Sequence, residues 1–192
     1  VAPHIFTDKI EIGTTWRRER PQTSPVLARQ TICAIRRPCA ASRHFNQAGV
    51  AAFQAGLAEE AVDLLQAAVS QSPKNAEAQT NLGNVLAHLG RESDAAAAYE
   101  QAMQSDPSYS EAFFNFGILM EATGQPARAV IALKKTLEKM PHHDSAWHGL
   151  GNSLKALGRL EEAKKAFETA LNEDPTLAVV RPNLAAVFHE LG

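Results

Sequence analysis

The stretch WHGLGNSLKALGRLEEAKKAFETALNEDP, which runs from Trp147 to Pro175, decides the fold of this chain. Its apolar residues recur three and four positions apart on either side of Gly158, so each half can line one face of a helix. Glycine reaches the positive φ at which many helices end, and proline cannot continue a helix. The stretch therefore predicts two helices that are joined by a turn at Gly158 and closed before Pro175.

The same pattern recurs along the chain at an interval of 34 residues. The repeating positions are Gly49, Gly83, Gly117 and Gly151; Gly56, Gly90, Gly124 and Gly158; Ala61, Ala95, Ala129 and Ala163; and Pro73, Pro107, Pro141 and Pro175. A fixed period between about 20 and 50 residues indicates a repeat array. We predict four helix pairs, at residues 42–75, 76–109, 110–143 and 144–177, followed by a partial fifth unit at 178–192. This fifth unit supplies a single helix, which either caps the array or marks where a longer chain was cut. Because caps usually have a polar outer face and this helix offers Val187 and Phe188, we expect the natural chain to continue past Gly192.

The repeat resembles the signature of the tetratricopeptide repeat (TPR) family. The residues that carry the resemblance are Trp147, Leu150, Gly151 and Leu154, then Gly158, Ala163, Phe167, Ala170 and Pro175. The resemblance covers residues 42–192 and implies an all-α fold, a right-handed superhelical solenoid of antiparallel helix pairs. One pair cannot bury its apolar face alone, so stability comes from stacking on the next pair. Gln79 and Arg181 stand where Trp147 stands in its own repeat, and we expect them to loosen the packing there.

Residues 1–41 differ from the repeats in charge and composition. They hold seven Lys and Arg against three Asp and Glu, whereas residues 42–192 hold twelve against eighteen. Four prolines exclude a long helix, and only residues 26–37 could form a short one. We predict a basic, disordered tail, with an Arg-rich targeting presequence as the alternative. The acidic repeat region lacks the clustered basic face that binds nucleic acid, so we predict no nucleic-acid partner.

Composition also limits the compartment and the cofactors. The two cysteines, Cys33 and Cys39, lie outside the repeats and form no CxxC pair. No apolar run approaches the roughly 20 residues that a membrane-spanning helix needs. We therefore predict a cytoplasmic protein with no membrane association and no cofactor.

The sequence supports neither a metal site nor an active site. His142, His143, Asp144 and His148 crowd one turn between repeats, but so few ligands seldom complete a metal shell, and Asp144 stands where a helix N-cap is expected. The chain contains neither a GxSxG elbow nor a phosphate-binding loop. We predict no metal site and no catalytic residue, and therefore no enzymatic activity in this chain.

The first helix of every pair lines the concave side of such an array, which is the usual binding surface. The resemblance places the following residues there as a partner-binding groove: Asn46, Glu77, Asn81, Asn84, His88, Glu111, Phe114, Asn115, Ile118, His148, Asn152 and Lys155. Asn81, Asn115 and Asn183 share one repeat position, and asparagine can both donate to and accept from a peptide backbone. This spacing is similar to the asparagine ladder in the TPR arm of O-linked N-acetylglucosamine transferases, although Gln47 and Gly149 interrupt it.

Three functions remain open from the sequence. The first is an interaction scaffold that binds an extended peptide or a partner helix in this groove. The second is the substrate-recognition arm of a larger glycosyltransferase, sulfotransferase or methyltransferase, which would continue past residue 192. The third is self-association through the C-terminal helix. We rank the scaffold first, because the repeated polar positions lie on the predicted concave side.

Overall fold

The computed structural model describes residues 38–192, with side chains from Ala41 onward, and every element in this part of the chain is an α-helix. The predicted basic tail and the short helix at 26–37 lie almost wholly outside the described residues. The first described helix begins at Pro38, four residues before the predicted start of the repeats. The described part of the chain divides into two compact units, residues 38–112 and 113–192.

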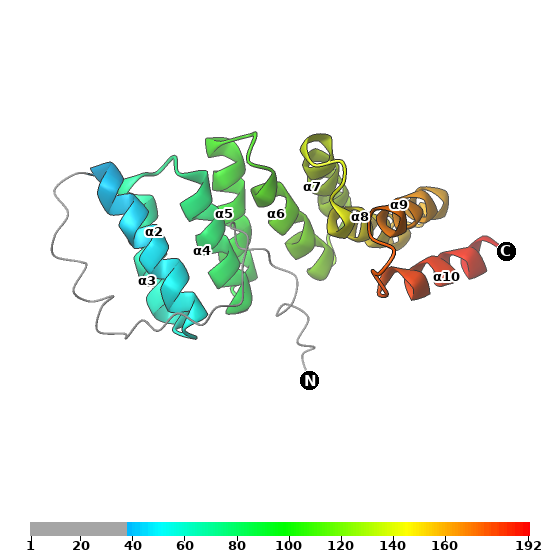
Figure 1. Cartoon of the computed structure of the whole chain (residues 1–192), viewed down its shortest axis with the longest axis horizontal. Coiled ribbons are helices and arrows are strands. Elements are labelled where there is room, and N and C mark those ends of the chain that lie inside the picture. The colour runs from blue at the N-terminus through cyan, green and yellow to red at the C-terminus, as the bar shows by residue number, and fades with distance from the viewer. Residues whose placement is uncertain (1–37) are drawn as a thin grey trace. The chain divides into compact units, whose positions relative to one another are not determined.

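The first unit contains two helix pairs and the beginning of a third. Helix α2 (Pro38–Gln54) packs beside α3 (Ala58–Gln71), and α4 (Ala76–His88) packs beside α5 (Glu92–Ser105). Figure 1 shows these helices in blue, cyan and green. Helix α6 (Ser110–Ala122) starts in this unit and ends in the next.

The second unit contains the rest of α6 and four further helices. These are α7 (Pro126–Lys139), α8 (Asp144–Ala156), α9 (Leu160–Glu173) and α10 (Val180–Leu191). Each of α7, α8, α9 and α10 contacts its neighbour in the sequence, and α10 also contacts α8 (Figure 1). Pro126 is the first residue of α7, a position where its missing N–H costs little.

The turn inside each pair depends on a glycine, as Gly90 illustrates. Gly90 follows α4 with φ of 74°, a conformation that side chains with a Cβ rarely adopt. Its N–H donates to the carbonyl of Ala87, and the N–H of Arg91 donates to the carbonyl of Leu86, so the last carbonyls of the helix find partners. This geometry confirms that these glycines end the first helices.

A second glycine lets the two helices of a pair approach closely. A Cβ built on Gly83 would lie 2.5 Å from Cε1 of Tyr99, and one built on Gly151 would lie 2.5 Å from Cε1 of Phe167. Both aromatic side chains are at most 1% exposed. In these two pairs a large ring of the second helix is therefore packed on the bare backbone of the first, and Leu65 and Leu133 take the same place against Gly49 and Gly117.

Three of the four turns between pairs have a side-chain donor six residues after the proline, and the turn at Pro107 has Phe113 there. Gln79 donates through Nε2 to the carbonyl of Pro73 at 2.7 Å, and Trp147 donates through Nε1 to that of Pro141 at 2.7 Å. Arg181 does the same through Nη2 for the carbonyl of Pro175, at 3.0 Å. In these three turns the position shares a hydrogen-bond donor rather than an aromatic ring, and the looser packing expected at Gln79 and Arg181 stays a prediction.

This role predicts the outcome of two substitutions at Trp147. Trp147→Phe keeps a ring but removes the donor, and we expect it to lower the free energy of unfolding by about 0.5–1.5 kcal/mol. Trp147→Gln restores a donor of the kind that Gln79 supplies, and we expect it to lose less. Urea unfolding followed by circular dichroism measures both; a larger loss in Trp147→Gln than in Trp147→Phe would show that the ring matters more.

Candidate functional site

The candidate site is the side of each unit formed by its first helices. In the first unit α2 contacts α4, and in the second unit α8 contacts α10, although another helix separates each pair in the sequence. Polar side chains join these helices directly. They form one chain of hydrogen bonds in each unit, which we call a relay.

The relay of the first unit runs from a carboxylate through two amides. Asn46 on α2 donates through Nδ2 to Oε1 of Glu77 on α4 at 3.0 Å, and Asn81 donates through Nδ2 to Oδ1 of Asn46, also at 3.0 Å. A carboxylate can only accept, so Glu77 fixes which end of the Asn46 amide faces it, and Asn46 in turn fixes Asn81. Asn46 and Asn81 are 4% and 3% exposed, so the relay lies beneath the surface.

The second unit repeats this order with other residues. Asn152 on α8 donates through Nδ2 to Oε1 of Glu121 on α6 at 2.8 Å, and Asn183 on α10 donates through Nδ2 to Oδ1 of Asn152 at 3.1 Å. The carboxylate again sets the orientation of both amides. Asn152 and Asn183 are half-buried, in contrast to the buried amides of the first unit.

His148 completes the second relay. Its Nε2 lies 3.3 Å from Nδ2 of Asn152 and 3.1 Å from Nδ2 of Asn183. Both amide nitrogens are donors, so Nε2 must accept and the neutral ring carries its proton on Nδ1. The side chain is 4% exposed and also lies against the ring of Phe167. His148 therefore ties α8 to α10 beneath the surface of the first helices.

Other predicted groove residues pack inside the units. Asn84 accepts a hydrogen bond at 2.8 Å from the hydroxyl of Tyr99, whose pKa is raised by burial and by the charge of Glu111. Phe114 is 3% exposed and its ring lies 4.5 Å from that of His143. Asn84 and Phe114 therefore lie in the interior, where they support the first helices.

The remaining predicted residues differ in exposure. His88 is exposed and meets the ring of Phe53 edge-on at 5.0 Å. Glu111 is half-buried and accepts from the hydroxyl of Tyr109 at 2.9 Å, and burial together with the Glu111 charge raises the pKa of Tyr109. The others are Asn115, which is buried, and Ile118 and Lys155, which are half-buried. The structure thus connects five of the predicted residues through the two relays, namely Asn46, Glu77, Asn81, His148 and Asn152.

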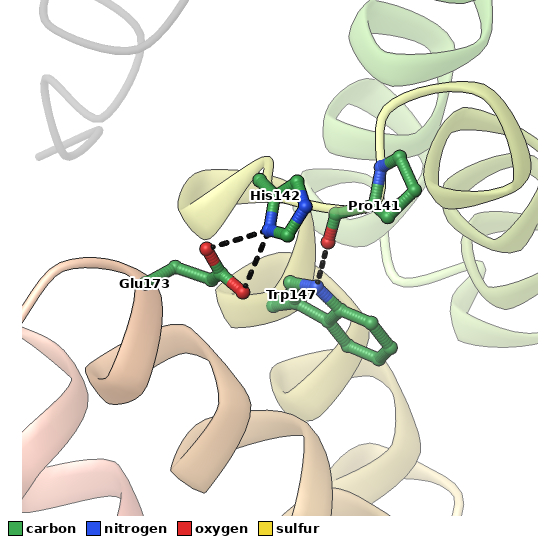
Figure 2. Close-up of polar contacts among 4 residues, drawn as sticks. All are labelled: Pro141, His142, Trp147 and Glu173. Atoms are coloured by element: carbon green, nitrogen blue, oxygen red, sulfur yellow. Dashed lines mark hydrogen bonds and ion pairs between the residues drawn. The ribbon is translucent and has the colours of Figure 1, made fainter.

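The two histidines in the turn between α7 and α8 make different contacts. Nδ1 of His142 pairs with the carboxylate of Glu173 at 3.0 Å, beside the Trp147 indole that holds the Pro141 carbonyl (Figure 2). Nδ1 of His143 accepts from the N–H of Ala146. His143 is therefore the N-cap of α8, and the expectation that Asp144 fills this position is wrong. Among residues 38–192, no three His, Cys, Asp or Glu side chains gather as a metal site would require.

Within the described part of the chain, no helix combines the length and the apolar character that crossing a bilayer requires.

The largest exposed apolar side chain of α10 is Phe188, at 48%, and the ammonium of Lys164 lies 4.9 Å from its ring. Self-association through this helix stays a prediction.

Stacked helix pairs with glycine turns at a fixed period define a helical-repeat protein, an all-α solenoid. Two models of the tetratricopeptide repeat family match the sequence, at residues 46–110 and 122–186, which together span more than half of the chain. The chain belongs to the tetratricopeptide repeat family. No curated protein sequence matches it significantly.

Solved structures of other TPR proteins share this fold. MamA from Desulfovibrio magneticus RS-1 is 20% identical with a TM-score of 0.72, covering 76% of this chain and 82% of its own. YrrB, described as a TPR protein with an unusual peptide-binding site, is 20% identical with a TM-score of 0.71, covering 78% and 77%. PilF of Pseudomonas aeruginosa is 21% identical with a TM-score of 0.72, covering 80% and 70%. Identities this low show the fold alone.

Proposed function

We propose that the first-helix side of the array binds an extended peptide segment of a partner protein. The observation that carries this proposal is the pair of relays, which hold amide side chains of neighbouring first helices in fixed orientations. A rigid polar surface loses little conformational freedom on binding, so more of the interaction energy remains as affinity. Three titratable residues of this side, Glu77, Glu121 and His148, are used within the relays, where they orient the amides.

The second unit supplies the more accessible part of this surface. Asn152 and Asn183 are half-buried, and Oδ1 of Asn183 is not used by the relay, so it can accept from a peptide N–H. The half-buried Ile118 and Lys155 lie on the neighbouring first helices and can contact side chains of the same peptide. The relay amides would hold the backbone, and these flanking residues would select the sequence.

The proposal is tested by selecting random linear peptides on the full chain. We expect the selected peptides to lose about tenfold in affinity for Asn152→Ala/Asn183→Ala, since each lost backbone hydrogen bond costs about 0.5–1.5 kcal/mol. Asn172→Ala, an exposed asparagine on α9, is the matched control and should bind as the wild type does. Circular dichroism verifies that each variant keeps its helices. If no peptide is selected, or if the double substitution leaves binding unchanged, the proposal fails.

The alternative, a substrate-recognition arm of a larger transferase, would use the same first-helix side. No contact in the described residues favours it over a scaffold. It therefore stays a prediction, as does the cytoplasmic location.

A further inference from the structure

A second candidate site lies in the first unit, away from the relay. An open pocket of about 590 Å³ is lined by Ser42, Arg43, Ser72, Pro73, Lys74 and Asn75. It lies between the first turns of α2 and the turn that joins α3 to α4. None of the residues that line it is acidic, and Arg43, Ser72, Lys74 and Asn75 can donate from their side chains, whereas the buried Ser42 hydroxyl already donates to the carbonyl of Ala68 at 2.9 Å.

The positive charges of this pocket are unusual for their surroundings. Residues 38–112 contain nine Asp and Glu but only three Lys and Arg. Arg91 pairs with Asp94 at 2.7 Å, whereas Arg43 and Lys74 form no ion pair with any described residue. Two of the three cations in an acidic unit thus line one pocket, and no Asp or Glu is among its lining residues.

The acceptors around the pocket are already used within the protein. The carbonyl of Pro73 accepts from Gln79, and that of Ser72 accepts from the N–H of Asn75 at 3.0 Å. The side chain of Asn75 caps α4 through Oδ1, which leaves its Nδ2 as a donor. Carbonyl oxygens repel anions, and these two are already used in bonds within the protein.

In two later repeats, the turn at the equivalent position contains a carboxylate that accepts hydrogen bonds within the turn. Between α5 and α6, Oδ1 of Asp106 accepts from both the N–H and the hydroxyl of Ser108, at 2.8 and 2.6 Å. Between α9 and α10, Asp174 accepts from Thr176 in the same way, at 2.8 and 2.6 Å. The side-chain and backbone hydrogen bonds of Ser108 and Thr176 lower the pKa of Asp106 and of Asp174, so each turn stabilises a negative oxygen.

The first turn lacks this internal anion. One repeat before Asp106 stands Ser72, and one repeat before Ser108 stands Lys74, so a carboxylate has been replaced by a hydroxyl and a hydroxyl by a cation. The turn between α7 and α8 has no Asp either, but there Glu173 supplies a carboxylate to His142 (Figure 2). Among the four turns between pairs, the first alone has cations and no carboxylate partner within the described residues.

We propose that the pocket formed by Ser42, Arg43, Ser72, Lys74 and Asn75 binds a phosphoryl group. The oxygens of the phosphoryl group take the place that the Asp carboxylate occupies in the later turns. A phosphomonoester carries close to two negative charges at neutral pH, which match Arg43 and Lys74, whereas a carboxylate would neutralise only one of them. The group is supplied either as free inorganic phosphate or on a phosphorylated serine, and the site does not depend on the peptide surface proposed above.

The test is a titration of the ¹⁵N-labelled full chain with inorganic phosphate at constant ionic strength, followed by NMR. We expect saturable shifts confined to residues near 42–43 and 72–76, and an affinity about tenfold weaker in Arg43→Gln and in Lys74→Gln. Arg91→Gln removes the third cation of the same unit, outside the pocket, and should bind phosphate as the wild type does. All three residues are exposed, so the variants should keep the fold.

Two further titrations identify the ligand. N-acetyl-O-phosphoserine amide that binds at least tenfold more tightly than inorganic phosphate assigns the site to a phosphorylated serine, and the reverse order assigns it to the free ion. Acetate should bind at least tenfold more weakly than either. Acetate binding as tight as phosphate, shifts that do not saturate, or an equal loss in Arg91→Gln would each overturn the proposal.

Discussion

Phe167→Ala should lower the free energy of unfolding by about 3–5 kcal/mol, the largest effect that we expect from one substitution in this chain. The Phe167 side chain is fully buried and lies against both the backbone of Gly151 and the ring of His148. Removing it leaves a cavity between α8 and α9, and neighbouring side chains fill such a space only in part. The loss is measured by urea unfolding, with circular dichroism at 222 nm reporting helix content.

A substitution at Gly151, whose backbone contacts the Phe167 ring, tests the same packing. In an ordinary helix, Gly→Ala stabilises by about 1 kcal/mol, since alanine restricts the unfolded chain and favours helix. At Gly151 the new Cβ would lie 2.5 Å from the Phe167 ring, so we expect Gly151→Ala to destabilise instead, by about 1–3 kcal/mol.

The sign should reverse once the ring is gone. In the Phe167→Ala background the added methyl group meets no ring and fills part of the cavity, so Gly151→Ala should become stabilising. A double-mutant cycle measures this coupling. If Gly151→Ala has the same effect in both backgrounds, the two residues are not in the contact that the structure shows.

These glycine–ring pairs could be predicted from the sequence because they follow the 34-residue period. Gly83 with Tyr99 and Gly151 with Phe167 recur at the same spacing, so the period indicates that the two pairs are equivalent, and the structure shows that each glycine contacts its ring. The TPR resemblance, the helix pairs and the all-α solenoid depend on this regularity, and the family matches and solved structures confirm them.

The relays and the cationic pocket depend instead on departures from the period. The sequence placed Asn46, Glu77 and Asn81 on one side, but not the hydrogen bonds between them, because adjacent first helices bring together residues 31 and 35 positions apart rather than 34. Ser72 and Lys74 carried a signal that was overlooked, since the later repeats place Asp106 and Ser108 at these positions. The donor role of Gln79 was missed because side chains at that position were compared by size rather than by hydrogen-bonding capacity.

The second large loss of stability is expected from a substitution in the first relay. Asn46→Ala should lower the free energy of unfolding by about 1–3 kcal/mol, the usual loss when a buried polar group is left without its partner. Glu77 is exposed and can turn to water, but Asn81 is 3% exposed and would keep an unpaired amide nitrogen in the interior. The cost therefore arises mainly at Asn81. Asn172→Ala, at an exposed asparagine of α9, should be near neutral in the same unfolding experiment.

This explanation predicts how Asn46→Ala and Asn81→Ala combine. Asn46→Ala leaves Nδ2 of Asn81 without its acceptor and Asn81→Ala leaves Oδ1 of Asn46 without its donor, whereas the double substitution removes both amides and returns Glu77 to water. The double variant should therefore lose less stability than the sum of the two singles, with a coupling of about 1 kcal/mol or more. Additive losses would mean that the two side chains contribute by separate packing, and that the relay does not join α2 to α4.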